Sequence, residues 1–173
     1  MPKKCRRWCS MKKTLFLVRH AKSSWDDVAL PDKERPLADR GKRDAPMMGE
    51  RLANRQVKPD LIVSSPARRA LSAAEIIAKE LNYRAEDIVV DERLYATEAN
   101  MLLGVIAELS DKLKCVMIFG HNPEFADLAQ RLSNEPALMP TCAVAQFTFE
   151  SASWASIGST KPTEVLLDYP KKG

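Results

Sequence analysis

Apolar runs of strand length alternate with amphipathic segments along most of this chain, and that alternation limits its fold more than any other feature. TLFLV at 14–18 and CVMIF at 115–119 have the length and composition of buried strands. Between them, Ala70, Ala74 and Ile77 recur at the spacing of one helix face. This order predicts a single three-layer α/β/α domain, with a mostly parallel sheet covered by helices on both faces.

The pattern also places the individual elements. The 173-residue chain fits one domain. Pro46 is expected to kink the first helix or to make its first turn irregular. The last two strands are expected near an edge of the sheet. Strands are expected at 14–18, 61–64, 88–91, 115–119, 143–149 and 164–167, and helices at 37–56, 66–81, 99–112 and 123–133.

The net charge of +4 is concentrated in residues 1–10, which carry four Lys and Arg side chains and no acid. We expect these residues to form a disordered or non-native tail, with Met11 as a second plausible start, and residues 11–173 to form the domain. The rest of the chain has 23 basic and 23 acidic residues, so no nucleic-acid partner is expected.

Two further features of the composition bear on location. No apolar run approaches the roughly 18 residues that a membrane span needs, so no membrane partner is expected. The four cysteines form no CxxC pair and no disulfide framework. Thiols of this kind are typical of a reducing compartment, and a cytoplasmic location is expected.

Both histidines of the chain directly follow predicted strands. His20 comes after 14–18 with Arg19 before it, and His121 comes after 115–119 in the segment GHNP. Arg69 lies in SSPARRA, which follows the strand at 61–64. Because ligands of such sheets bind beyond the carboxyl ends of the strands, these four side chains are expected to share one site.

The same segments are suited to bind a phosphoryl group. Ser65 and Asn122, each followed by proline, are placed to cap the helices that they precede. The free N–H groups at a helix start favour an anion. With Arg19, Arg69 and a protonated His121 added, the site favours phosphate, because one arginine can donate hydrogen bonds to two phosphate oxygens at once.

His20 is the candidate nucleophile of this site. Neutral imidazole is available near pH 7 because the pKa of histidine is about 6.5, and nearby arginines favour the neutral form. His20 can then attack phosphorus in line and hold the phosphoryl group until water releases it. No metal or other cofactor is expected, since the HExxH, P-loop and GxGxxG motifs are all missing from the sequence.

The three segments, in this order, resemble the motifs of the histidine phosphatase superfamily, the phosphoglycerate mutase-like group. LVRHAKS stands for its RHG motif, SSPARRA for its SxxxRA segment and GHNP for its second histidine. The resemblance covers residues 13 to about 133 and implies the fold of that group. It implies that His20 is phosphorylated and that Arg19, Arg69 and His121 form the phosphate pocket. Arg69 is chosen over Arg68 because it directly precedes the alanine of the motif.

Two departures point to one branch of that family. Ala21 replaces the usual glycine, and Lys22 stands where mutases often carry an acid. The resemblance is closest to the small bacterial phosphohistidine phosphatases, which share the RHA form. Arg35, in ERPLADRG, matches a segment of this branch and is a candidate to face the substrate.

The expected function is a phosphatase acting on phosphohistidine, with a phosphorylated protein or a small phosphorylated molecule as its substrate. One alternative is a small-molecule phosphomonoesterase on the same scaffold. Such enzymes of the family have a glutamate acid after the third strand, where Glu92 and Glu98 stand here without a recognisable motif. Mutase activity is a further alternative. From another class, a non-catalytic phosphoprotein-binding module stays open, although the intact His20 argues against it.

Overall fold

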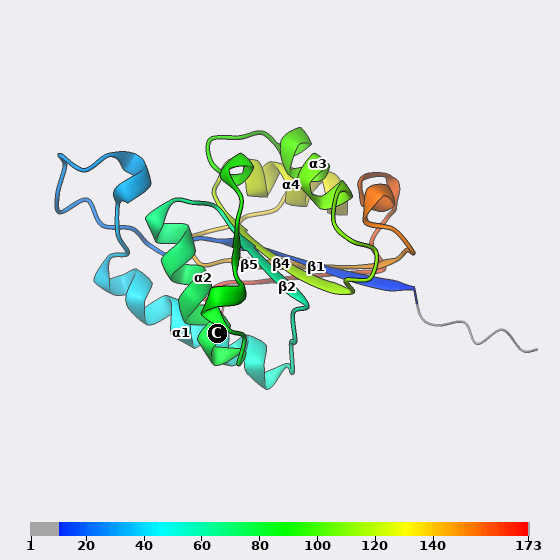
Figure 1. Cartoon of the computed structure of the whole chain (residues 1–173), viewed down its shortest axis with the longest axis horizontal. Helices are drawn as coiled ribbons and strands as arrows, with labels where there is room; N and C mark the ends of the chain where they lie inside the picture. Colours follow the sequence, from blue (N-terminus) through cyan, green and yellow to red (C-terminus); the bar gives the residue numbers. More distant parts are fainter. Residues whose placement is uncertain (1–10, 173) are drawn as a thin grey trace, which may run out of the picture.

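Figure 1 shows the protein as a computed structural model that describes residues 11–172. The expected tail at 1–10 lies outside these residues. The strands are β1 (Lys12–Arg19), β2 (Leu61–Ser64), β3 (Val89–Val90), β4 (Cys115–Gly120), β5 (Val144–Glu150) and β6 (Glu164–Asp168). The α-helices are α1 (Asp39–Asn54), α2 (Arg68–Glu80), α3 (Ala99–Ala107) and α4 (Glu124–Ser133), and the 3-10 helices are η1 (Asp32–Glu34), η2 (Ala85–Asp87), η3 (Glu92–Leu94) and η4 (Trp154–Ser159).

The six strands form one mixed sheet in the order β3-β2-β4-β1-β5-β6. β1, β2, β3 and β4 run parallel. β5 pairs antiparallel with β1, and β6 pairs antiparallel with β5 at the edge of the sheet. The predicted α/β fold with a mostly parallel sheet is therefore confirmed. In the register between β1 and β4, Arg19 pairs with Gly120. The residues that follow these two, His20 and His121, consequently leave the sheet side by side.

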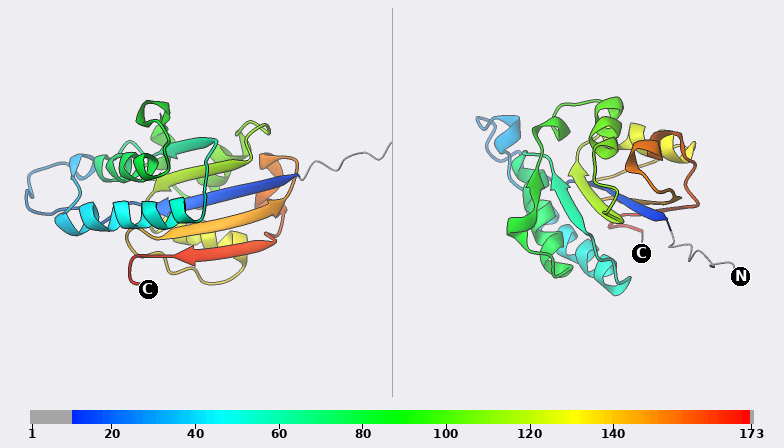
Figure 2. Two further views of the ribbon diagram at one scale, coloured as in Figure 1. Left: turned by 90° about the horizontal axis from the view of Figure 1, so that it is seen from below. Right: turned by 45° about the vertical axis from the view of Figure 1, so that its right-hand side comes forward.

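Helices cover both faces of the sheet, as Figures 1 and 2 show. Alternate side chains of β1 enter the two cores, because successive strand residues point to opposite faces. Phe16 and Val18 pack with α1 and α2 on one face. Leu15 and Leu17 pack with α3, α4 and η4 on the other. The three-layer architecture predicted from the sequence is thus confirmed, and it fixes β1 in the middle of the molecule.

Two helix boundaries differ from the prediction at the places where the chain passes the strand ends. α2 begins at Arg68 and not at Pro66, and no side chain caps its first turn. The Ser65 hydroxyl accepts from the N–H of Ala67 over 3.3 Å, just ahead of the helix, and also lies 2.8 Å from Nε2 of His121. α3 ends at Ala107, well before the predicted end at 112. The hydroxyl of Ser110 accepts a hydrogen bond from the N–H of Lys112 and turns the chain toward β4.

α1 approaches the segment after His20 very closely. Gly41 makes this possible, since a Cβ atom at this position would overlap the carbonyl oxygen of Lys22. The same carbonyl accepts a hydrogen bond of 2.8 Å from the N–H of Ala38. α1 runs on through Pro46, with Ala45 and Met48 buried on its inner face. The first helix therefore supports the backbone immediately beside the first histidine.

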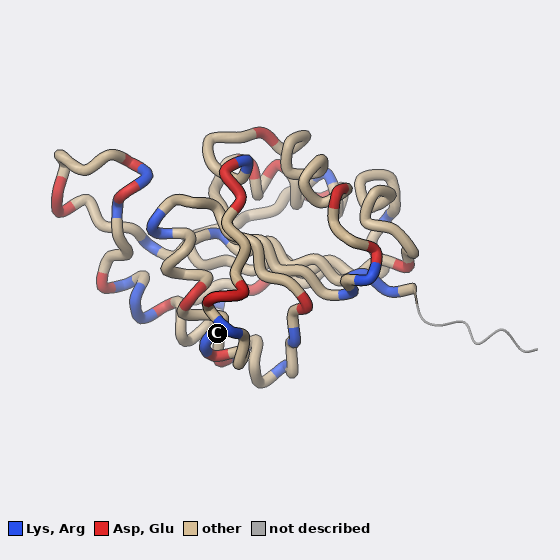
Figure 3. The backbone as a smooth tube through the Cα atoms, viewed as in Figure 1, with Lys and Arg blue, Asp and Glu red and all other residues tan. Residues whose placement is uncertain are grey.

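Residues of both charges are distributed along the chain. In Figure 3, basic and acidic residues alternate along the backbone of residues 11–172, in keeping with the equal numbers that the sequence gives outside residues 1–10. Within the same residues, none of the helices is long and apolar enough to cross a membrane.

Candidate active site

The two histidines lie together at the carboxyl edge of the parallel strands. The N–H of His20 donates to the carbonyl of Gly120 over 3.0 Å, which ties the end of β1 to the end of β4. The centroids of the His20 and His121 rings are 5.1 Å apart, and the ring planes are inclined by 51°. Each residue is 8% exposed. The rings thus lie side by side, and a small part of each residue is open to solvent.

His20 is held in one tautomer. Its Nδ1 lies 2.7 Å from the carbonyl oxygen of Ala21, which can only accept a hydrogen bond. Nδ1 therefore carries the proton, and the lone pair is on Nε2. Burial lowers the pKa of His20 to about 4. The hydrogen bond to the Ala21 carbonyl acts to raise this pKa, and the positive charges of Arg69, Arg19 and Arg35 act to lower it. The ring is neutral and nucleophilic at pH 7.

His121 is also neutral, which corrects the expectation of a protonated ring. Burial lowers its pKa to about 3, helped by the nearby His20 and Arg69. Charging a ring that is buried among cations costs free energy, and the cations of the site therefore favour the neutral form of His121. The Nε2 of His121 lies 2.8 Å from the Ser65 hydroxyl, so Ser65 orients this ring. The Tyr95 ring meets it edge-on at 5.7 Å.

Three arginines surround the histidine pair. Arg69 and Arg35 are 7% and 6% exposed, whereas the neighbouring Arg68 is exposed. Arg19 donates from Nη1 to the carbonyl of Met139 over 3.0 Å, and burial lowers its pKa. The structure therefore brings Arg19, Arg69 and His121 around His20, as the sequence suggested, and adds Arg35 to the same group.

Asp32 is the residue of this site that the sequence analysis missed. Its Oδ2 accepts from Arg69 Nη2 over 2.8 Å and from the Tyr95 hydroxyl over 2.9 Å, while its Oδ1 accepts from Arg35 over 3.0 Å. Arg69 Nη1 donates to its main-chain oxygen over 2.6 Å. The only feature of the sequence that could have indicated a role for Asp32 is its spacing from Arg35 in DKER, and this spacing is equally typical of a local ion pair.

The pKa of Asp32 follows from these contacts. Partial burial acts to raise it, but the hydrogen bonds from Arg69, Tyr95 and Arg35 outweigh this effect and lower it to about 2. Asp32 is therefore a carboxylate at any physiological pH. It reduces the positive charge of the pocket and holds Arg69 in place.

The two candidate acids of the ester-phosphatase alternative lie on the surface. Glu92 forms an ion pair of 2.8 Å with Lys33, and its side chain is 74% exposed. Glu98 is exposed at the N-cap of α3, where its side chain makes no capping hydrogen bond. Neither side chain contacts the histidine pair, among the interactions that the structure gives for residues 11–172.

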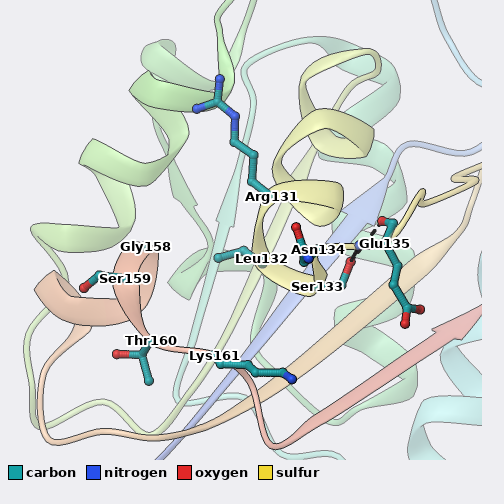
Figure 4. A pocket seen from close by; sticks show the side chains of 9 residues that line it. All are labelled: Arg131, Leu132, Ser133, Asn134, Glu135, Gly158, Ser159, Thr160 and Lys161. Carbon is teal, nitrogen blue, oxygen red and sulfur yellow. Dashed lines mark hydrogen bonds between the residues drawn. The ribbon is translucent and has the colours of Figure 1, made fainter.

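A pocket of about 390 Å³ lies apart from this cluster, between the end of α4 and the segment 158–161 (Figure 4). It includes Arg131 and Lys161 but neither histidine. α4 starts beside the site and rises about 1.5 Å per residue, so its last turn lies far from His121. Within residues 11–172, no group of three His, Cys, Asp or Glu side chains is arranged to hold a metal ion.

A known family model matches residues 15–114, and its description is the histidine phosphatase superfamily, branch 1. The chain belongs to the histidine phosphatase superfamily. The matched segment contains His20 and Arg69, and His121 follows it. As a histidine phosphatase, the protein is a phosphatase that acts on phosphorylated substrates.

The chain is also similar to individual proteins in sequence or in fold. An uncharacterised chloroplastic protein of Arabidopsis thaliana is 29% identical over 153 residues, which are 84% of this chain and 70% of that protein. The structure of a putative phosphohistidine phosphatase SixA from Nakamurella multipartitia superposes with a TM-score of 0.78 at 21% identity, covering 92% of this chain and 97% of that one. A putative SixA from Agrobacterium tumefaciens gives 0.75 at 25% identity, covering 89% and 97%.

The depressed pKa values predict how this histidine phosphatase responds to pH. We expect neither ring to gain a proton between pH 8 and pH 5, because their pKa values lie at about 4 and about 3. The chain has only these two histidines, so a proton NMR titration of the imidazole C–H signals reads them directly. A midpoint near 6.5 for either signal would contradict this.

The same shifts act on stability. Both pKa values are lower in the folded state, so the unfolded chain binds more protons as the pH falls below about 6.5. Stability is therefore lost from that pH downward, by up to about 1.4 kcal/mol per pH unit for each histidine, and the loss levels off near the folded pKa. Urea unfolding at pH 7 and pH 5 measures it.

Proposed function

We propose that this histidine phosphatase hydrolyses the P–N bond of phosphohistidine substrates through a covalent phosphoryl group on His20. The observation that carries the proposal is a neutral His20 that lies among arginines with its lone pair on Nε2. The carboxyl group that lies with these arginines, that of Asp32, is ionised and cannot act as an acid. Such a site suits a substrate whose leaving group departs without strong acid catalysis.

The proposed reaction has two steps at phosphorus. His20 Nε2 attacks, the bond from phosphorus to the substrate nitrogen breaks, and the phosphoryl group is held on His20. Arg19, Arg69 and His121 bind its oxygens and stabilise the charge that develops on them. Water then attacks phosphorus on the side opposite His20, the bond from phosphorus to His20 Nε2 breaks, and phosphate leaves with the protons of the water. The Nδ1 proton stays on His20, hydrogen-bonded to the Ala21 carbonyl in both steps, so His20 returns to the same tautomer.

The leaving group separates this proposal from ester hydrolysis. An alkoxide is a poor leaving group, and an enzyme that expels one needs a placed general acid worth about 10²–10⁴ in rate. Asp32 cannot supply that proton at neutral pH, since its pKa is about 2. Imidazole leaves far more easily, because its conjugate acid has a pKa of about 6.5. The pocket is therefore suited to P–N cleavage and poorly suited to alkyl esters.

A substrate series tests the proposal. We expect kcat/KM for a phosphohistidine peptide or phosphoramidate to exceed that for any alkyl phosphate by at least about tenfold, with nitrophenyl phosphate between them. Glu92→Gln and Glu98→Gln are expected to leave phosphohistidine hydrolysis nearly unchanged, since both side chains are exposed. If an alkyl ester is the best substrate and one of these changes destroys its hydrolysis, the enzyme is a phosphomonoesterase.

We also propose that the reaction needs no metal ion. Arg19, Arg35 and Arg69 already place three positive charges around His20, which is the charge that a metal would otherwise provide. Activity in EDTA is therefore expected to equal that in buffer. Loss of activity in EDTA, restored by a divalent cation, would overturn this assignment.

A further inference from the structure

We infer that Asp32 binds the leaving imidazole of the substrate and accepts a hydrogen bond from the ring nitrogen that is not bonded to phosphorus. This inference rests on the proposed function and adds a residue that contacts the substrate. It assigns to Asp32 a part of the substrate beyond the phosphoryl group, which the arginines and histidines bind.

The position of Asp32 supports this role. Its carboxylate contacts Arg69 and Tyr95, and the Tyr95 ring meets the His121 ring edge-on. The negative charge of Asp32 is close enough to act on the His121 ring. Its side chain is 50% exposed, in contrast to the 8% of the arginine side chains that it contacts. Asp32 therefore lies between the phosphate-binding groups and solvent, where the leaving group of a bound substrate must extend.

The carboxylate has the capacity to accept one more hydrogen bond. A carboxylate offers about four acceptor sites, two on each oxygen. Arg69 and Tyr95 occupy those on Oδ2, while Arg35 is the single partner of Oδ1. One site on Oδ1 is therefore free in the described structure. The three donors also fix the orientation of the group, so that little freedom is lost when a substrate binds.

The reaction requires a proton on the ring nitrogen of the substrate that Asp32 would face. Phosphohistidine becomes reactive when its second ring nitrogen is protonated, since the ring then leaves as neutral imidazole. When His20 attacks, the electron pair of the P–N bond goes to the departing nitrogen. The proton stays on the other nitrogen, and no proton has to be transferred. A carboxylate that accepts a hydrogen bond from that N–H favours the protonated, reactive form.

Asp32 is also placed to act only by holding Arg69, and the two roles predict different results. Arg69 binds the phosphoryl group, which all substrates share, so a role through Arg69 affects every substrate equally. A role toward the leaving group affects only substrates that carry a ring N–H. The comparison of substrates therefore distinguishes them.

The decisive variant is Asp32→Asn, which keeps the shape of the side chain and removes its charge. We expect kcat/KM for N-phosphoimidazole to fall at least tenfold at pH 8, and less at pH 6, where the substrate is protonated without help. The value for nitrophenyl phosphate is expected to fall by a clearly smaller factor, which measures the part of the loss that acts through Arg69 and is shared by all substrates. Asp26→Asn is the matched control, because it removes a charge from the same loop at an exposed position that forms no ion pair within residues 11–172.

A second measurement compares two substrates, with the wild-type enzyme and with the Asp32→Asn variant. A phosphoimidazole methylated on its second nitrogen carries the positive charge but has no N–H to donate. Relative to the uncatalysed rates, we expect the wild-type enzyme to prefer the unmethylated compound at least tenfold, and Asp32→Asn to lose this preference. Equal losses for all substrates, or no discrimination by the wild type, would overturn the role of Asp32. A wild-type enzyme that prefers alkyl esters would instead overturn the proposed function.

Discussion

Replacing His20 with alanine is expected to abolish turnover, with a loss of about 10⁴-fold or more, because the substitution removes the group that forms the covalent intermediate. The fold is expected to survive. The side chain of His20 has one hydrogen-bond partner, the adjacent Ala21 carbonyl, and lies at the open end of β1. Activity and thermal unfolding, measured on the same preparation, separate the two effects.

The covalent step has its own readout. Phosphate bound to histidine is labile in acid, so brief incubation with labelled substrate and denaturation in base should leave label on the wild-type protein and none on the His20→Ala variant. His121→Ala serves as the matched control, since it alters the same pocket and retains the nucleophile. A His20→Ala variant that keeps even a tenth of the wild-type rate would exclude the covalent mechanism.

Replacing Arg69 with alanine is expected to cost at least about 2 kcal/mol of transition-state stabilisation, or roughly thirtyfold in kcat/KM, by analogy with the loss of an oxyanion donor. The buried guanidinium lies beside His20 and is held by two hydrogen bonds to Asp32. Arg69→Lys is expected to recover only part of the loss, because a lysine provides charge without the paired N–H groups of a guanidinium.

Arg68→Ala provides the control for this prediction. Arg68 precedes Arg69 in the same first turn of α2 but is exposed, so the helix turns it away from the pocket. We expect its replacement to change kcat/KM less than twofold to threefold. If Arg68 proves to be the sensitive residue, the assignment of the phosphate-binding arginine is displaced by one position.

The chain's alternating pattern was sufficient to predict the architecture. Leu15 and Leu17 are apolar on one side of a strand, Phe16 and Val18 on the other, and only a sheet covered on both faces buries them all. The placement of His20 and His121 at strand ends followed from the same pattern, since carboxyl ends of parallel strands share an edge. Local sequence determines these features because they depend on periodicity and chain order.

Only the tertiary structure decided the electrostatics of the site. His121 is neutral because burial and neighbouring charges act on it together, and those neighbours come from the ends of two different strands, β1 and β2, or from the segments that follow them. Ser65 orients His121 across 56 positions of the chain, and the Tyr95 hydroxyl donates to Asp32 across 63. Hydrogen bonds and desolvation depend on which distant residues meet, and no local pattern specifies that. The sequence by itself therefore determined the scaffold and the two histidines, whereas their protonation and the place of Asp32 were decided by the folded chain.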